Sequence, residues 1–201
     1  MKTVLGDIRR ADEDFEMIAP GDRVAVGVSG GKDSLLLLYA LSLYRKFEHK
    51  DFELRGIMLD MGFEAFDASP VMRWCEELNI PFDVIQTDIA KVVFDLRKEN
   101  NPCSLCAKMR RGALNDAAKR LGCNKVALGH HREDAIETLM MSLIFEGRLH
   151  TFHPNMFLLG ANVTVIRPMV YVTEKHVIHV ARRLNPVSYT HLRAHETLAN
   201  L

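Results

Sequence analysis

Short apolar runs alternate with segments of helical hydrophobic periodicity along most of this chain. The apolar runs predict strands, and the periodic segments predict helices. The expected strands are 23–28, 53–59, 82–85, 125–128 and 163–167; the expected helices are 32–45, 70–78, 88–97, 107–121, 133–148 and 173–184. Strands that alternate with helices form a parallel sheet with helices on both faces. We therefore expect a doubly wound α/β fold with a mostly parallel, five-stranded sheet.

The pattern also divides the chain into three parts. Residues 1–22 form a lead-in with one short helix, and 23–185 form a single domain in which 150–160 is expected to be irregular. Residues 186–201 have no clean periodicity and resemble a translated sequencing adapter more than a protein segment. We expect this tail to be non-native and exclude it from functional reasoning.

The 201 residues are enough for one domain with a sizeable core, and 48% of them are hydrophobic. No apolar run approaches the roughly 20 residues of a membrane span. The acidic N-terminal segment also lacks the apolar stretch of a secretory signal. We therefore expect a cytoplasmic protein without a membrane partner.

Charge is distributed unevenly, although the formal net charge is zero. Residues 1–100 contain 13 lysines and arginines against 19 aspartates and glutamates, whereas residues 101–185 contain 12 against 6. A basic half could face a nucleic acid. Solvated helix faces would give the same counts, so composition leaves both interpretations open.

A glycine-containing loop, Ser29-Gly30-Gly31-Lys32-Asp33-Ser34, joins the first expected strand to the leucine-rich helix. Adjacent glycines allow the backbone to approach a ligand, and the first N–H groups of the helix lack intrahelical partners. The serines add hydroxyl groups, Lys32 adds a positive charge, and Asp33 could help to hold Mg²⁺. The loop therefore predicts a phosphate or pyrophosphate site. It has the spacing of neither the common P-loop nor the dinucleotide fingerprint, and the alternative is a plain strand-to-helix turn.

Two further groups of polar residues follow expected strands. Asp60 ends the second strand, and Gly129, His130, His131 and Asp134 follow the fourth. The carboxyl ends of parallel strands share one edge, where open α/β sheets bind ligands, so we expect these residues near the loop. Asp60 suits a ribose or a metal ion, but a turn aspartate fits equally well. The histidines suit phosphate and substrate contacts better than one shared metal ion, and a helix cap is the alternative.

Four cysteines in a cytoplasmic chain indicate metal or redox chemistry rather than disulfides. Cys103 and Cys106 form a C-x-x-C at the start of an expected helix, a position that lowers thiol pKa values. This pair completes neither a zinc site nor an iron–sulfur cluster, and two unligated thiols are the alternative. The basic residues Lys108, Arg110 and Arg111 follow, and they could hold RNA, balance a cluster or form a solvated face.

Together, three motifs resemble those of the PP-loop ATP pyrophosphatases and, within that superfamily, the tRNA 2-thiocytidine synthetases. The motifs are S-G-G-K-D-S at 29–34, N-P-C-S-L-C-A-K-M-R-R-G at 101–112 and A-L-G-H-H-R-E-D-A-I-E-T at 127–138. They occur in order, and the resemblance covers about residues 5–185. It implies a Rossmann-like PP-loop fold and an ATP-dependent tRNA sulfurtransferase.

The resemblance also implies a reaction. ATP and Mg²⁺ would bind at 29–34, the C2 oxygen of a tRNA cytidine would attack the α-phosphate, and a sulfur species would then displace AMP. The implied catalytic residues are Asp33, Cys103 and Cys106; the implied nucleotide-binding residues are Ser29, Gly30, Gly31, Lys32, Asp33, Ser34, Asp60, Gly129, His130 and Asp134. The implied partners are tRNA and a sulfur donor such as a cysteine desulfurase, and a homodimer is compatible with the family.

The chain departs from the family at the cluster. In the family, three cysteines hold a [4Fe-4S] cluster with one open iron, and Cys103 and Cys106 match two of them. The third normally lies beyond the last helix, where this chain has Ser188 to Leu201 and no cysteine. Cys123 does not match the third position, so we expect an incomplete cluster site. At Glu133 the family more often has aspartate, and the carboxylate is retained.

Two alternatives remain at this stage. Another PP-loop adenylating enzyme, such as a lysidine-type tRNA ligase, would need no cluster. A nucleotide- or RNA-binding module without catalysis would use the C-x-x-C as half of a zinc site between subunits.

Overall fold

The computed structural model describes residues 1–48, 50–63, 66–96 and 102–184. In these ranges six strands form one sheet, in the order β3-β2-β1-β4-β6-β5. The strands are β1 (Arg23–Gly27), β2 (Glu53–Asp60), β3 (Phe82–Gln86), β4 (Lys125–Ala127), β5 (Asn155–Leu158) and β6 (Val163–Ile166). The helices are α1 (Lys2–Phe15), α2 (Lys32–Phe47), α3 (Ser69–Glu77), α4 (Pro102–Arg120), α5 (Arg132–Met141) and α6 (Glu174–Leu184), with π-helical segments η1 (Lys91–Leu96) and η2 (Ser142–Glu146).

The expected doubly wound α/β fold is confirmed, with one more strand than predicted. All neighbouring strands are parallel except β5, which runs antiparallel to β6. The prediction that 150–160 is irregular was wrong, because β5 lies within it. This strand has four residues at the sheet edge and no fully buried side chain, so it carries no apolar alternation that could reveal it.

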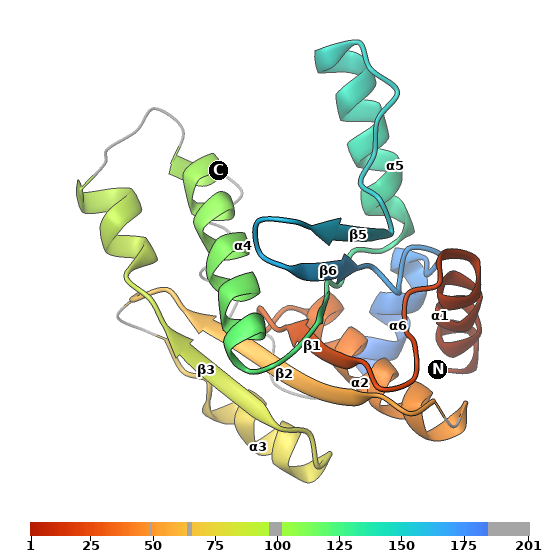
Figure 1. Ribbon diagram of the computed structural model, residues 1–201. Coiled ribbons are helices and arrows are strands. Elements are labelled where there is room, and N and C mark those ends of the chain that lie inside the picture. Colours follow the sequence, from red (N-terminus) through yellow and green to blue (C-terminus); the bar gives the residue numbers. More distant parts are fainter. Residues whose placement is uncertain (49, 64–65, 97–101, 185–201) are drawn as a thin grey trace.

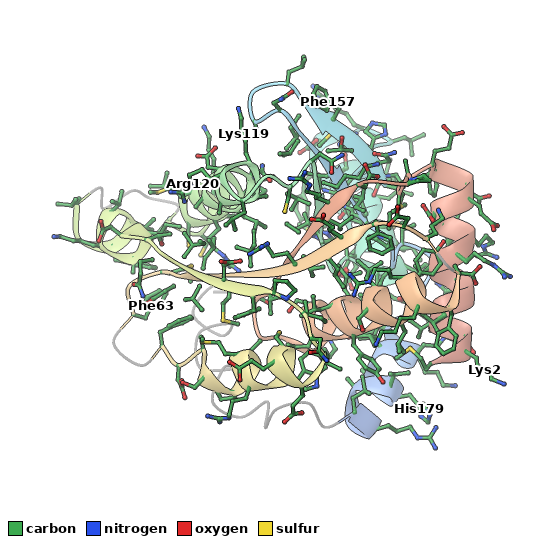
Figure 2. The ribbon with its side chains drawn as sticks, turned by 60° about the horizontal axis from the view of Figure 1, so that its bottom comes forward. Lys2, Phe63, Lys119, Arg120, Phe157 and His179 are labelled. Carbon is green, nitrogen blue, oxygen red and sulfur yellow. The ribbon has the colours of Figure 1, made fainter. Side chains whose placement is uncertain are left out.

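Alternate residues of the central strands face two different layers. Val24 and Val26 of β1 belong to the larger core, together with the leucines of α2 and apolar residues of α1, α3 and α6. Ala25 faces the opposite layer, where it joins a core that includes Ala117 and Ala118 of α4. Figure 2 shows this separation: Lys119 and Arg120 of α4 lie on one side of the sheet, and His179 of α6 lies on the other.

One helix, α5, lies outside these two layers. In Figure 1, α5 projects from the body, and none of its side chains is buried. No helix in the described ranges is both long and apolar enough to cross a membrane.

The strand order places a switch point between β1 and β4. From β1 the chain continues to β2 on one side, and it later returns to β4 on the other side. The connections after β1 and β4 therefore leave the same edge in opposite directions. Ligands of doubly wound sheets bind at such a switch point.

Candidate active site

The loop at 29–34 leaves β1 at this switch point and is held by its own hydrogen bonds. Gly30 has φ +83°, a left-handed conformation that glycine adopts without strain. The buried Ser34 hydroxyl accepts the Ser29 N–H at 3.1 Å and donates to the Gly31 carbonyl at 3.0 Å. Gly31 is the N-cap of α2, so the unpaired N–H groups of the first helical turn face the bend. This is the geometry of an anion cradle.

The turn after β4 packs directly on this loop. A Cβ atom added to Gly129 would lie 3.0 Å from the Asp33 carbonyl carbon and 3.1 Å from the Ser34 nitrogen. The neighbouring atoms are backbone, so a side chain at this position would force the two segments apart by a few tenths of an ångström. The structure thus brings together the residues predicted at 29–34 and at 129–134.

Lys32 and Asp33 carry the charge of the cradle. Lys32 Nζ lies 3.1 Å from Asp33 Oδ2 and 3.5 Å from Glu174 Oε1 at the start of α6. Burial alone would lower the pKa of Lys32, but the two carboxylates outweigh burial and raise it. Asp33 Oδ1 is buried without a hydrogen-bond partner among the described residues. A free carboxylate oxygen beside an anion cradle suits Mg²⁺, which is often held by one or two carboxylates and the phosphates of a nucleotide.

Glu174 was not among the predicted site residues. The only sequence feature that marks Glu174 is its position directly after Thr173, the expected N-cap of the last helix. Thr173 Oγ1 does accept the His176 N–H at 3.2 Å. Nothing in the sequence indicates that this helix start meets Lys32.

The turn at 130–134 is organised around the buried His131. The backbone N–H of His131 donates to Asp134 Oδ2 at 2.7 Å. Its ring nitrogens lie 3.3 Å from Glu133 Oε2 and 3.9 Å from Asp33 Oδ1. Asp134 therefore holds the shape of the turn, and His131 bridges the turn to the cradle.

Glu133 connects the same turn to α6. Its Oε2 atom accepts the backbone N–H of Glu174 at 2.7 Å. Burial would raise the pKa of Glu133, but this hydrogen bond and the contact with Arg132 lower it overall. Glu133, at a position where the family more often has aspartate, thus caps α6 with its carboxylate.

His130 contacts a second group of side chains, which follows β4 and β6. Its ring centroid lies 5.1 Å from that of Phe152, and the Arg167 guanidinium stacks over the same Phe152 ring at 4.7 Å. Burial is the main cause that lowers the pKa of His130, and the charge of Arg167 adds to it. His130 is therefore neutral near pH 7.

Asp60 lies at the carboxyl end of β2, on the edge that carries the cradle. Its Oδ1 atom accepts the Gly62 N–H at 2.9 Å, and its carbonyl accepts the Thr87 N–H at 2.8 Å. These bonds shape the local turn. A contact of Asp60 with ribose or metal stays a prediction.

The C-x-x-C lies in the first turns of α4, which begins at Pro102 and not near the predicted residue 107. Cys103 is partly exposed, whereas Cys106 is buried against Ile89 and Val93. The expectation of a lowered thiol pKa is wrong for Cys106: burial raises its pKa, although Arg110 opposes this effect.

The thiols lie beyond the carboxyl edge of the sheet. Leu114 of α4 packs beside Gly27, the last residue of β1: a Cβ added at Gly27 would lie 2.7 Å from Leu114 Cδ2. Cys106 comes eight residues earlier, about 12 Å further along the helix axis. In the described ranges no group of three or more His, Cys, Asp or Glu side chains has an arrangement that could hold a metal ion. The expected position of a third ligand and the tail at 186–201 fall outside these ranges.

Comparisons with known proteins agree with this architecture. The family model of the PP-loop domain matches residues 7–190. A tRNA-cytidine(32) 2-sulfurtransferase of Pelobacter propionicus is 41% identical over 172 residues, which are 85% of this chain and 64% of that protein. One of Geobacter sulfurreducens is 38% identical over 182 residues, which are 90% of this chain and 71% of that protein. The chain thus spans roughly two thirds of the length of these relatives.

Two solved structures are similar. The U34-tRNA thiolase NcsA from Methanococcus maripaludis, with its [4Fe-4S] cluster, superimposes with a TM-score of 0.72 at 28% identity, over 89% of this chain and 62% of that chain. A phosphoadenylyl-sulfate reductase from Candida auris has a TM-score of 0.56 at 14% identity and covers 93% and 89%, a likeness of fold alone. The chain belongs to the PP-loop domain family, and it is related within that family to the tRNA-cytidine(32) 2-sulfurtransferases.

Proposed function

We propose that this chain carries out ATP-dependent thiolation of a tRNA cytidine. The observation that carries the proposal is the presence of two chemically different groups at one sheet edge. The anion cradle at 29–34 follows β1, and the thiols of Cys103 and Cys106 rise from the same edge on α4. The names of the relatives supply the substrate class, a cytidine in tRNA.

The first step is activation by ATP. The C2 oxygen of the cytidine attacks the α-phosphate, the bond between the α-phosphate and its bridging oxygen breaks, and pyrophosphate leaves. Charge develops on the departing pyrophosphate, where Lys32 and the N–H groups at the start of α2 stabilise it. Asp33 Oδ1 supplies a carboxylate oxygen for Mg²⁺.

The second step is exchange of oxygen for sulfur. A sulfur nucleophile attacks C2, and the bond between C2 and oxygen breaks as AMP leaves with that oxygen. The target atom belongs to a base, so the enzyme must accept an unstacked nucleotide. The excess of basic residues after residue 100 fits an RNA substrate.

Cys103 and Cys106 would be ligands of an iron–sulfur cluster. They are three residues apart on one helix, so both can face the same group. The described residues provide no third ligand, and two thiolates do not complete a [4Fe-4S] cluster. When bound, such a cluster would supply an iron that can carry sulfur. A cytoplasmic location, a cysteine desulfurase as sulfur donor and a homodimer are parts of the same proposal.

The test measures two products of one reaction. The protein, reconstituted without oxygen and supplied with sulfide, ATP and unmodified tRNA, should release pyrophosphate only when tRNA is present. Mass spectrometry of the tRNA nucleosides should then detect 2-thiocytidine. Asp33→Asn should lower pyrophosphate release at least 100-fold, whereas Asp51→Asn, at an exposed position, should not change it.

The alternatives give different products. A lysidine-type ligase would modify tRNA only when lysine is added, and a binding module would bind ATP without releasing pyrophosphate. Either result would contradict the proposal.

A further inference from the structure

Arg167 is a buried charge with no acidic partner in the part of the chain that the structure describes. Its side chain follows β6, and only 8% of the residue is exposed. Nη1 donates to the His153 carbonyl at 2.6 Å, whereas Nε is buried without a hydrogen-bond partner among the described residues. Burial lowers the pKa of Arg167, and the charge of Arg111 lowers it further; no acidic side chain offsets these effects in the described ranges.

Such a group is costly in a folded protein. A buried guanidinium loses hydration, and unmade hydrogen bonds to a charged group cost more than those to a neutral group. Buried arginines are normally paired with an anion. The guanidinium is a rigid fork of donors that matches a phosphate, and its orientation is fixed here by the stack on Phe152 and the bond to His153.

The surrounding groups are also suited to an anion. His130 shares the Phe152 ring with Arg167. Arg111 of α4 is exposed, close enough to influence Arg167, and part of the helix that carries the thiols. The three nitrogen-bearing side chains come from three separate segments: Arg167 follows β6, His130 follows β4, and Arg111 belongs to α4.

We propose that Arg167, with Arg111 and His130, forms a second phosphate site that binds a phosphodiester of the single-stranded RNA substrate. The inference rests on the proposed function for the identity of the RNA. The site differs from the nucleotide cradle in position, because β4 lies between β6 and β1. Two strand spacings separate β6 from β1, about 9.5 Å. An RNA phosphate held there would fix the target nucleotide between the cradle and the thiols.

The test compares RNA binding with ATP binding. The probe is a fluorescent RNA stem-loop with the target cytidine in its loop, titrated at several salt concentrations. Arg167→Gln should weaken RNA binding 10- to 100-fold and reduce the salt dependence by about one phosphate contact. Arg167→Lys should recover only part of the affinity, because the fork is lost. ATP affinity should change less than twofold in both variants.

Two further variants test the phosphate site even if Arg167→Gln folds poorly. Arg111→Gln alters an exposed residue and should weaken RNA binding three- to tenfold with no change in thermal stability. Lys46→Gln, exposed in the last turn of α2, should leave RNA binding unchanged. A stem-loop with one methylphosphonate should bind wild-type protein more weakly at one position only, and Arg167→Gln should be insensitive to that substitution.

The outcomes separate this inference from the proposed function. Unchanged RNA affinity and salt dependence in Arg167→Gln and Arg111→Gln would overturn the phosphate site, even if 2-thiocytidine forms. An equal loss of ATP and RNA affinity would also overturn it, because the site would then serve the nucleotide. If the variants bind RNA and ATP as expected but the protein forms no 2-thiocytidine, the result would support the second phosphate site and contradict the proposed function.

Discussion

A side chain at position 129 would crowd the backbone of the anion cradle. In Gly129→Ala the new Cβ would lie 3.0 Å from the Asp33 carbonyl carbon, and backbone cannot move aside as a flexible side chain can. We expect at least a tenfold loss of ATP affinity, measured by calorimetry, and a loss of about 1–3 kcal/mol in unfolding free energy from overpacking. Gly6→Ala is the control, because nothing lies within 4 Å of its Cβ. Unchanged ATP affinity in Gly129→Ala would contradict the assigned contact.

His130 should make stability depend on pH. Burial lowers its pKa below the ordinary value of 6.5, so the unfolded chain takes up a proton before the folded protein does. The stabilisation is complete above pH 6.5 and is lost as pH falls toward the lowered pKa, by at most about 1.4 kcal/mol per pH unit. Urea unfolding at pH 7.5 and 5.5 should show a smaller loss in His130→Asn than in wild type. His150→Asn, which alters an exposed histidine, should keep the wild-type loss.

Helices and strands were predictable where apolar side chains define them. Strand β1 was predicted within one residue, because its residues Val24 to Val26 are buried on both faces of the sheet. The short edge strand β5 was missed, because none of its side chains is fully buried. The early start of α4 was missed although proline at a first helical position was a usable signal at Pro102.

The start of α6 depends on a carboxylate from α5. Glu133 Oε2 accepts the Glu174 N–H, which would otherwise be one of the unpaired donors of the helix N-terminus. We expect Glu133→Ala to lower the unfolding free energy by about 1 kcal/mol at pH 7, the usual value of a cap. The pKa of Glu133 is lowered in the folded state, so the difference from wild type should shrink as pH falls below about 4.5.

Glu137→Ala is the control for this cap. Glu137 is exposed one turn later on α5, so its removal should change unfolding free energy by less than about 0.5 kcal/mol. Equal effects of the two substitutions in urea unfolding would show that the bond to α6 does not stabilise the protein.

The complete site depends on how the chain returns to one edge. The motifs at 29–34 and 129–134 could be predicted to meet, because both follow parallel strands. The positions of Glu174 and Arg167 could not be predicted. Arg167 reaches the site through the strand order β1-β4-β6, and Glu174 reaches it through the docking of α6 on α2. A single acid or base at a strand or helix end has no distinctive sequence pattern, and its partner is set by tertiary structure.

ATP should therefore stabilise the whole domain and not the loop alone. The cradle joins β1 and α2, Gly129 packs the β4 turn against it, and Glu174 links α6 to Lys32. A ligand bound there contacts elements from both ends of the described chain, and unfolding must release it. ATP with Mg²⁺ at 100 times its dissociation constant should add about 2.7 kcal/mol to the unfolding free energy. For a domain of this size, the melting temperature should rise by about 5–10 °C.

Lys32→Ala should lose about half of this increase or more, because in the proposed binding mode the positive charge of Lys32 neutralises the pyrophosphate group of ATP. Pyrophosphate alone should stabilise wild-type protein more than AMP does, because in the proposed binding mode the cradle takes the β- and γ-phosphates. Differential scanning fluorimetry of each protein with and without ligand removes any effect of the substitution on the free protein. Lys46→Ala, an exposed lysine on the same helix, should keep the full increase. If Lys32→Ala also keeps the full increase in melting temperature, or if AMP stabilises the protein as well as pyrophosphate does, the pyrophosphate part of ATP is bound elsewhere than at 29–34.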